Sequence, residues 1–250
     1  MKRLIILLII ASLTFSSIAQ EDEEGDKTLP GEGEIIETAT VNNIDLGSED
    51  AIQEMLAQGD IEITLEDLVL DIDFSDEDDW EFYEEDTRFV MVDDGVYVAQ
   101  AEDNATIWGQ NTEPFEDGLI EVVATQDGGA DNNAFGVMCR ANEDNNLEGY
   151  HFWIASDGFA AIFLYEDNDD GYTALVDWFE ADVINLHTEN ILHVVCVGEY
   201  LAFYVNGELI AEVEDDTYDE GVTGLSLSNI EDGEYSRALF DDLRIWEADD

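Results

Sequence analysis

From about residue 71 onward, the chain alternates short apolar runs with turn residues, and this rhythm limits the fold more than any other feature of the sequence. Gly, Asn and Asp separate the runs at intervals typical of antiparallel strands joined by short loops, and helical periodicity is absent there. The pattern predicts an all-β domain, an antiparallel sandwich or barrel. Strands are expected at residues 95–99, 118–125, 135–139, 150–155, 159–165, 191–197, 200–205, 208–213, 223–228 and 238–246.

Two hairpins are marked by residue pairs that type I′ turns favour, Asp157-Gly158 and Asn206-Gly207. Both faces of the second hairpin are partly apolar, so the sequence assigns neither face to solvent. The register expected across the second turn pairs Tyr204 with Leu209, Ala202 with Ala211 and Phe203 with Ile210.

The first nineteen residues have the pattern of a secretory signal peptide. A Lys2-Arg3 start is followed by an apolar run at residues 4–15 and by small residues at the two positions that a signal peptidase reads, Ser17 and Ala19. The apolar run is too short to span a bilayer, and no second stretch of spanning length follows it. We therefore expect a secreted protein, extracellular or periplasmic, that does not insert into a membrane.

Residues 20–70 are expected to form an acidic linker that contains one short helix. Residues 21–34 combine acidic side chains with Gly and Pro and are too polar to order. A helix near residues 48–58 is predicted by Ser48 as its N-cap, by acidic residues in its first turn and by Gly59 as its stop. Its apolar face is formed by Ala51, Ile52, Met55 and Leu56.

Acidic residues outnumber basic residues by 64 to 7, which gives a formal net charge of −57. Because Lys2 and Arg3 leave with the signal peptide, five basic residues remain and the charge becomes −59. Such a chain repels nucleic acid and anionic lipid, so both are excluded as partners. The 45% hydrophobic content still supplies a core. The acids then lie mostly on the surface, which indicates a halophilic protein; calcium loading explains their even spread less well.

Cys139 and Cys196, the only two cysteines, each lie inside an apolar run. Export permits a disulfide between them. Buried free thiols are the alternative, and we favour it slightly because a bridge requires inward-facing side chains on adjacent strands.

Several segments of the expected domain share the pattern of one known superfamily. They are residues 73–76 followed by Trp80, residues 135–140, residues 150–153, residues 175–178 as a short segment before the next strand, residues 204–213 and residues 240–246. Together they resemble the concanavalin A-like lectin/glucanase superfamily, and within it the bacterial extracellular modules related to the 3-keto-disaccharide hydrolase and laminin G-like domains. The resemblance covers about 175 of 250 residues. It implies an antiparallel two-sheet jelly-roll sandwich over residues 71–247, in a superfamily of lectins, hydrolases and adhesion modules.

The sequence contains no convincing catalytic set. Glucanases of this fold carry glutamate, aspartate and glutamate at alternating positions of one strand. The nearest run is Glu214, Asp216 and Glu220, but it lacks the apolar alternation of a strand and has one residue too many before the last acid. The histidines His151, His187 and His193 have no metal-ligand spacing. We therefore lean against an enzyme.

Sugar binding requires an aromatic surface for the ring and planar polar groups for the hydroxyls. The candidates are Trp108, Arg140, Tyr150, Trp153 and Trp178. A core or structural role is the competing interpretation for each, because large aromatics on strands are usually buried and a lone arginine in an acidic protein often forms an internal ion pair.

Two acidic loops contain weaker candidates for a calcium site, with Asp127 and Asp131 in the first loop and Asp167 and Asp169 in the second. Neither loop has the spacing of the twelve-residue calcium loop, so solvated turns are the favoured interpretation. We expect no cofactor, with calcium as the ion to test.

Three functions are compatible with these patterns. The first is a secreted, non-catalytic module that binds carbohydrate or a cell-surface glycan, which predicts exposed aromatic residues on one sheet face. The second is a glycoside-processing hydrolase of the same fold, which predicts two carboxylates that converge in a cleft. The third is a structural or protein-interaction module with an aromatic-free outer face. We rank them in that order.

Overall fold

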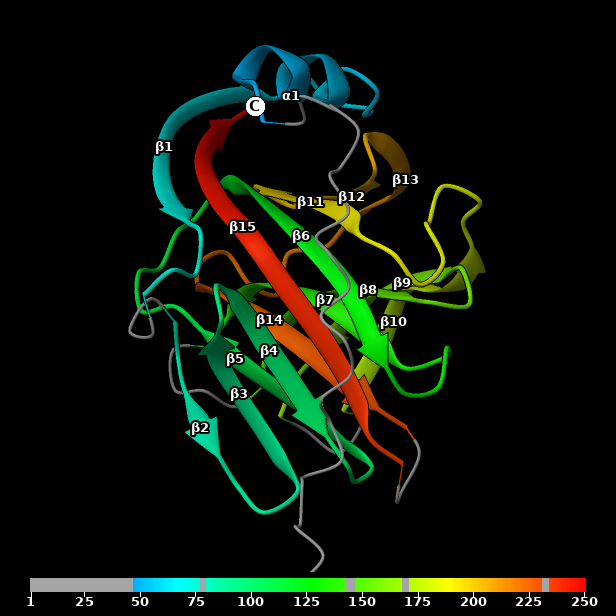
Figure 1. The fold of residues 1–250 in the computed structure, drawn as a ribbon. Coiled ribbons are helices and arrows are strands. Elements are labelled where there is room, and N and C mark those ends of the chain that lie inside the picture. Colours follow the sequence, from blue (N-terminus) through cyan, green and yellow to red (C-terminus); the bar gives the residue numbers. More distant parts are fainter. Residues whose placement is uncertain (1–46, 77–79, 143–146, 168–170, 231–233) are drawn as a thin grey trace, which may run out of the picture. The chain divides into compact units, whose positions relative to one another are not determined.

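The computed structural model describes residues 47–76, 80–142, 147–167, 171–230 and 234–250, all of which belong to the unit Asp45–Asp250. These residues form one helix and two antiparallel sheets (Figure 1). The elements are α1 (Glu49–Leu56), β1 (Thr64–Ile72), β2 (Tyr83–Glu84), β3 (Arg88–Asp93), β4 (Val96–Ala101), β5 (Ala105–Gln110), β6 (Gly118–Gly128), β7 (Ala134–Ala141), β8 (Gly149–Ala155), β9 (Phe159–Tyr165), β10 (Tyr172–Glu180), β11 (Asn190–Val197), β12 (Tyr200–Val205), β13 (Glu208–Glu214), β14 (Val222–Asn229) and β15 (Ser236–Asp249). The predicted all-β jelly-roll sandwich is confirmed.

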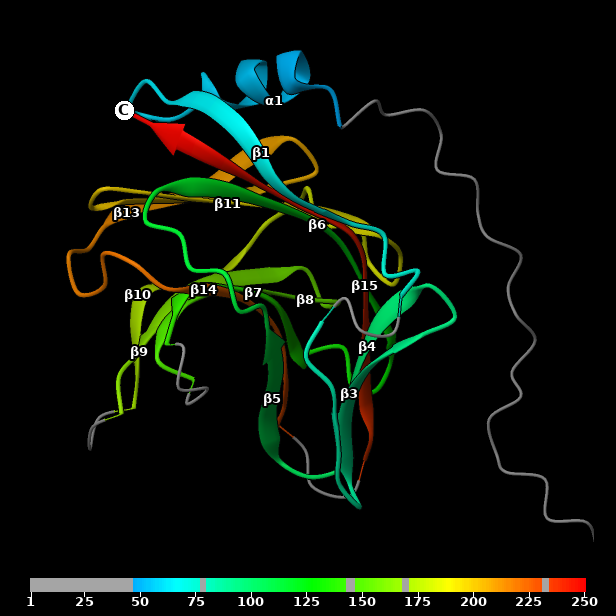
Figure 2. The ribbon, with the colours of Figure 1, turned by 90° about the vertical axis from the view of Figure 1, so that its left-hand side faces the viewer.

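The two sheets differ in size. The larger sheet has the order β13-β12-β11-β6-β15-β4-β3-β2, and β1 also pairs with β15, which makes nine strands. The smaller sheet has the six strands β10-β9-β8-β7-β14-β5. Figure 2 shows the six-stranded sheet on one side of the larger sheet and α1 on the other. All ten strands expected from the sequence are present, and β1, β2, β3, β5 and β10 were missed.

The core lies between the two sheets. Successive side chains of a strand point to opposite faces, so alternate residues of each strand enter the core. Phe152 in β8 and Phe203 in β12 are fully buried, and they contact each other between the two sheets, with ring centroids 5.6 Å apart. Burial of one such side chain stabilises the fold by roughly 1.5–3 kcal/mol. This packing holds the two sheets together.

Both predicted hairpins are present, although only the second turn has the expected conformation. Asn206 and Gly207 have φ values of 52° and 83°, as a type I′ turn requires. In the first turn only Gly158 has a positive φ, of 91°, and its amide donates to the carbonyl of Ala155. That geometry is a type I turn followed by a left-handed glycine, so the type I′ expectation for Asp157-Gly158 was wrong.

The register of the β12–β13 hairpin is only partly as predicted. Tyr204 pairs with Leu209, which confirms the first expected pair. A bulge next to that pair shifts the rest of the ladder by one residue, because an extra residue on one strand displaces every later partner. The observed pairs are Phe203 with Ala211 and Ala202 with Glu212.

Helix α1 packs on the outer face of the nine-stranded sheet. The Ser48 hydroxyl accepts a hydrogen bond from the Ala51 amide at 3.3 Å, which confirms the predicted N-cap. Ile52, Met55 and Leu56 are buried against apolar residues of that sheet. No helix in the described part of the chain is long and apolar enough to cross a membrane.

The sandwich begins at Thr64, earlier than the boundary expected near residue 71. Strand β1 lies in the segment assigned to the linker and pairs with β15. Its acidic residues Glu66, Asp67 and Asp71 interrupt the apolar alternation, which is why the sequence did not reveal it. The expected signal peptide and residues 20–46 lie outside the described residues.

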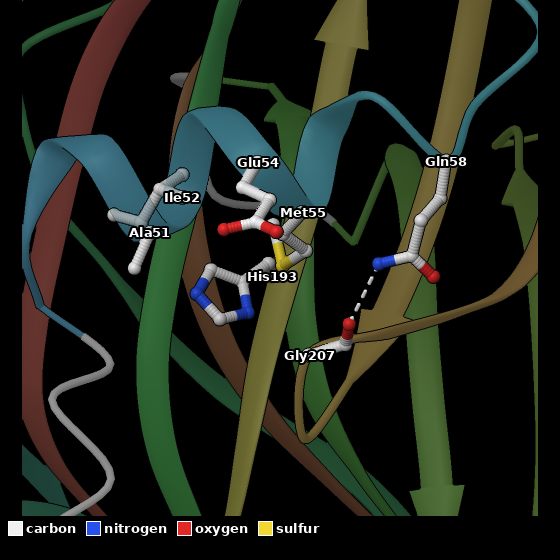
Figure 3. Close-up of a pocket in the computed structure, with 7 residues that line it drawn as sticks. All are labelled: Ala51, Ile52, Glu54, Met55, Gln58, His193 and Gly207. Atoms are coloured by element: carbon white, nitrogen blue, oxygen red, sulfur yellow. Dashed lines mark hydrogen bonds between the residues drawn. The ribbon is translucent and has the colours of Figure 1, made fainter.

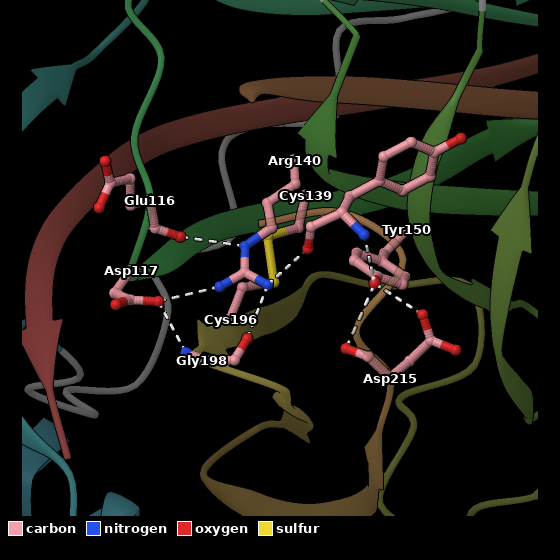
Figure 4. Close-up of a disulfide and its surroundings, with 9 residues drawn as sticks. Glu116, Asp117, Cys139, Arg140, Tyr150, Cys196, Gly198 and Asp215 are labelled. Atoms are coloured by element: carbon pink, nitrogen blue, oxygen red, sulfur yellow. Dashed lines mark hydrogen bonds and ion pairs between the residues drawn. A yellow bond between two sulfur atoms is a disulfide. The ribbon is translucent and has the colours of Figure 1, made fainter. Parts of the chain in front are cut away.

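Cys139 in β7 and Cys196 in β11 form a disulfide that joins the two sheets (Figure 4). The slight preference for free thiols was therefore wrong. The strands are not neighbours within one sheet; they face each other across the core, where both cysteines are fully buried. The disulfide thus connects strands that no hydrogen-bond ladder connects.

We predict that removal of this disulfide destabilises the fold. The two cysteines are 57 residues apart, and the loop-closure entropy of such a crosslink corresponds to about 4 kcal/mol. Denaturant titration of the Cys139→Ser/Cys196→Ser double variant should show this loss. Reductant should lower the midpoint of the parent protein and leave that of the variant unchanged; equal midpoints for all four samples would contradict the prediction.

Candidate functional site

A row of residues across the six-stranded sheet brings two of the sequence candidates together. The strand registers align Trp108 in β5 with Ser226 in β14, Gly136 in β7, Trp153 in β8 and Ala161 in β9. Residues aligned in this way point to the same face of a sheet. Because the residues on either side of this row enter the core, the two tryptophans lie on the outer face.

Trp178 extends the same row onto the edge strand β10. A register shift between Val176 and Phe179 places Trp178 beside Ala161 of β9, and its ring centroid lies 5.8 Å from that of Phe163. The row therefore runs from one edge strand to the other. At about 4.8 Å between strands, it spans about 24 Å. The three tryptophans singled out from the sequence share one surface.

Small residues between the tryptophans shape this surface. The indole Nε1 of Trp153 donates to the Ser226 hydroxyl at 2.9 Å, so its ring reaches across β7 to β14. The strand between them presents Gly136, where a Cβ atom would lie 2.1 Å from the carbonyl oxygen of Phe152. A side chain at that position would clash with the backbone. Gly136 and Ser226 thus leave room for the indole of Trp153 to lie across β7 towards β14.

Further aromatic side chains surround Trp153. Its ring centroid lies 5.0 Å from that of His151, 5.7 Å from that of Phe163 and 5.2 Å from that of Tyr172. These contacts leave only 5% of Trp153 exposed, whereas Trp178 is 38% exposed. Trp153 therefore supports the surface, and Trp178 is the tryptophan that solvent reaches most freely.

A hollow of about 230 Å³ lies beside Trp178. Its lining combines the aromatic rings of Trp178 and Phe159 with the polar side chains of Asn132 and Asp157, and Ala155 completes it. Phe159 is 38% exposed, as Trp178 is. Aromatic rings next to amide and carboxylate oxygens are the groups that a sugar ring contacts with its C–H face and its hydroxyls.

The central strands of this sheet contain no carboxylates. Among the 64 acidic residues of the chain, not one lies in β5, β7, β8, β9 or β14. The edge strand β10 contributes Asp177 and Glu180, which are both exposed. Glu214 ends β13 in the other sheet, and the loop after it carries Asp216 and Glu220. No described strand of this face holds the alternating carboxylates of a glucanase.

Arg140 lies in the interior beside the disulfide (Figure 4). It is 2% exposed, and its guanidinium donates to the carboxylate of Asp117 at 2.9 Å. The same group donates to the backbone carbonyls of Glu116, Gly198 and Tyr218 at 2.8–3.0 Å. Arg140 thus fixes three loops beside the disulfide, and its planar donors are occupied.

Tyr150 is fully buried in the core next to Cys139, its partner across the strand pair. Its hydroxyl donates to the Asp215 carboxylate at 2.7 Å and accepts from the Tyr218 amide at 3.0 Å. Burial raises the pKa of Tyr150. Of the five candidate ligand residues, Arg140 and Tyr150 therefore do not share the surface with the tryptophans.

Two of the acidic residues proposed for calcium lie next to a basic side chain. Asp127 lies 3.5 Å from Arg237, and Asp131 lies 3.7 Å from His187. The backbone amide of Asp167 donates to Glu148, and Asp169 lies outside the described residues. Within the described residues, no group of three or more His, Cys, Asp or Glu side chains could hold a metal ion. Calcium binding stays a prediction.

A buried ionic cluster on the nine-stranded sheet was missed by the sequence reasoning. His193 Nε2 lies 2.8 Å from Glu121, and Arg244 pairs with the other oxygen of the same carboxylate. A hollow of about 280 Å³ between α1 and this sheet includes His193 and Gln58 in its lining (Figure 3). The sequence did contain a signal for this cluster. Glu121 and His193 are ionisable residues that each lie inside an apolar run, and they are partners on the adjacent strands β6 and β11. The cluster supports the docking of α1.

The aromatic neighbours of the tryptophans were also missed. Sequence reasoning selected tryptophans and passed over Phe159, Phe163, Tyr165 and Tyr172, which line the same face. In β9 an alternating pattern was available, because Phe159, Phe163 and Tyr165 lie at odd positions and Ile162 and Leu164 at even ones.

Comparison with solved structures identifies the fold. The carbohydrate-binding module CBM66 from Bacillus subtilis matches 60% of this chain and 86% of its own, with a TM-score of 0.51 and 17% identity. A protein of unknown function with a galectin-like fold, also from Bacillus subtilis, matches 74% and 98%, with a TM-score of 0.55 and 13% identity. The catalytic domain of an endo-1,3-β-glucanase (laminarinase) from Thermotoga petrophila RKU-1 matches 74% and 99%, with a TM-score of 0.51 and 12% identity.

This protein has the concanavalin A-like lectin/glucanase fold, as the sequence resemblance implied. No protein family model matches the sequence, and no curated protein matches it. The fold is shared by carbohydrate-binding modules and glycoside hydrolases, so the fold alone does not separate binding from catalysis.

We predict that His151 makes the stability of this sheet depend on pH. Burial lowers the pKa of His151 to about 4, and the hydrogen bond to the Leu147 carbonyl opposes this shift. In the unfolded chain the pKa is about 6.5, so below that pH the unfolded state takes up a proton that the folded state excludes. Stability is fully present above pH 6.5 and decreases as the pH falls towards 4.

The measurement is the free energy of unfolding between pH 7.5 and 4 for the parent protein and for the His151→Phe variant. The variant removes this titration and keeps an apolar ring. The parent should lose more stability than the variant over this range, by an amount on the order of 3 kcal/mol. Parallel pH profiles would show that His151 contributes no such dependence.

Proposed function

We propose that the protein is a secreted, non-catalytic module that binds carbohydrate, and that the row of tryptophans on the six-stranded sheet is its binding surface. The single observation that carries this proposal is the alignment of Trp108, Trp153 and Trp178 on one outer face, beside a hollow that combines aromatic and polar side chains.

The chemistry of this surface supports a sugar ligand. A pyranose ring has an apolar face of C–H groups that packs on an indole, and equatorial hydroxyls that require hydrogen-bond partners. Trp178 and Phe159 offer the rings, and Asn132 and Asp157 offer the polar groups at the same hollow.

The absence of carboxylates on the central strands favours binding over hydrolysis. A glycosidase requires two carboxyl groups on either side of the scissile bond, about 5–9.5 Å apart. The described strands that form the floor of the row provide none. A purely structural module is less favoured, because an aromatic-free outer face was expected for it.

Export and a saline environment complete the proposal. Residues 1–19 have the pattern of a signal peptide, and the mature charge of −59 suits a protein whose surface is screened by counterions. The partner is then a polysaccharide or a cell-surface glycan outside the cell.

We predict that the Trp178→Ala variant binds glycan at least tenfold more weakly, which corresponds to about 1.4 kcal/mol. The parent protein is first applied to a glycan array at high salt, with and without a chelator, and the best ligand is titrated by calorimetry. Trp178 is 38% exposed, so its replacement leaves the core intact.

The matched control is Phe82→Ala, since Phe82 is 59% exposed and precedes β2 in the other sheet. It should bind like the parent protein. Equal affinities of the parent and the folded Trp178→Ala variant would show that this surface does not bind the glycan. A parent protein that binds no glycan would refute the proposed function.

We also predict that the protein does not hydrolyse the glycan that it binds, because the described central strands lack the two carboxylates that hydrolysis requires. Reducing ends released from that glycan should stay at the level of a protein-free control over a day. Release that disappears in the Asp177→Asn/Glu180→Gln variant would show instead that β10 supplies a catalytic pair.

A further inference from the structure

Every arginine in the described residues is engaged away from the tryptophan row. Arg88 in β3 pairs with Glu85 at 2.6 Å, and Arg237 in β15 lies 3.5 Å from Asp127. Arg244 pairs with Glu121 next to helix α1. The fourth, Arg140, donates to Asp117 in the interior. Three of these residues belong to the nine-stranded sheet, and none of the four is directed to the outer face of the six-stranded sheet.

The row itself consists of uncharged groups. Its strands β5, β7, β8, β9 and β14 contain no Asp or Glu, and its polar atoms include the hydroxyls of Thr106, Ser226 and Ser228. Thr106 donates to Ser228 at 3.0 Å. His151 is fully buried there, and burial lowers its pKa to about 4, so it is neutral at physiological pH. The polar groups of the row are therefore neutral; Thr106, Trp108 and Ser228 are partly exposed, whereas Trp153 and Ser226 are buried.

Acidic side chains lie around this neutral floor. Asp157 lines the hollow and is exposed, as is Asp131, whose side chain is 58% exposed. Asp177 and Glu180 are exposed on the edge strand β10. The protein as a whole has a charge of −57. A ligand thus approaches through a negative field and contacts a surface on which the charged groups of the described residues, such as Asp157, are acidic.

We propose that this surface selects uncharged glycans and rejects polysaccharides that carry carboxylate or sulfate groups. The inference rests on the proposed function and adds the chemical class of the ligand. An anionic sugar would lose its hydration at the row without a cation to replace it, and removal of a charge from water without a partner is costly. It would also be repelled by Asp157 and Asp177. A neutral glycan has neither the cost of removing a charge from water nor the repulsion by the acidic side chains.

Binding measured at two salt concentrations distinguishes the selection at the row from the repulsion by distant charges. The Debye length falls from about 10 Å at 0.1 M salt to about 3 Å at 1 M, so high salt removes the repulsion between distant charges. It does not supply the missing cation at the row. A neutral glycan should therefore bind equally at both salt concentrations, and an anionic glycan should remain unbound at both.

The test measures binding of the mature protein to three polysaccharides by affinity electrophoresis and calorimetry, at 0.1 M and 1 M NaCl. The probes are a neutral glycan chosen from the array, polygalacturonate as the anion and chitosan as the cation. The expected result is binding of the neutral probe that changes less than threefold with salt and weakens at least tenfold in Trp178→Ala. Polygalacturonate should bind at least a hundredfold more weakly at both salt concentrations.

Each other outcome bears on a specific statement. Binding of polygalacturonate at 1 M NaCl that depends on Trp178 would overturn the selection of uncharged glycans and leave the proposed function intact. The same holds for chitosan if it binds at 1 M NaCl more tightly than the neutral probe. Chitosan binding that appears only at 0.1 M NaCl and is unchanged in Trp178→Ala supports the proposal, because it reports the outer acidic field. No binding of any probe would overturn both.

Discussion

The structure depends on the burial of one face of each sheet against the other. Strand side chains alternate, so the side chains that enter the core determine which ones face outward. Phe152 meets Phe203 between the sheets, and the disulfide joins β7 to β11 in the same layer. Once Phe152 is buried, its neighbours His151 and Trp153 must lie on the outer face. The row of tryptophans follows from the packing of the core.

The two outer faces then differ in what the chain places on them. Helix α1 covers part of the nine-stranded sheet, and Glu121, His193 and Arg244 form a buried cluster beside it. Arg244 also donates to the carbonyl of Gly47, just before the helix. No helix among the described residues covers the six-stranded sheet, and aromatic side chains pack there against one another. Part of one sheet is covered by the chain's own helix, and in the proposed function the other sheet presents its outer face to a ligand.

The distribution of charge reinforces this division. Acidic residues are abundant in the chain and absent from five of the six strands below the tryptophan row. Buried carboxylates require partners, and the described arginines pair with acidic residues outside this face, including Arg140 of β7, which pairs with Asp117 in the interior. An acidic surface thus surrounds a row of neutral groups, which is why the acidic composition alone says little about the ligand.

Much of the fold could be read from the sequence, because period-two alternation and turn residues are local signals. They located ten strands, helix α1 and both hairpins, and they marked Trp108, Trp153 and Trp178. They missed β1 and β10, where acidic residues and register shifts break the alternation. They could not decide between a core role and a surface role for an aromatic residue, since both faces of these strands are apolar.

The tertiary structure determines which aromatic residues lie in the core and which lie on the surface. It brought Cys139 and Cys196 together across the core, directed Tyr150 inward and surrounded Arg140 with the carbonyls of three loops. It also aligned three tryptophans that are far apart in the chain. The sequence by itself determined ten of the fifteen strands of the described residues and the signs of the charges. Which side of each strand faces the other sheet depends on contacts between distant residues, and only the folded chain contains them.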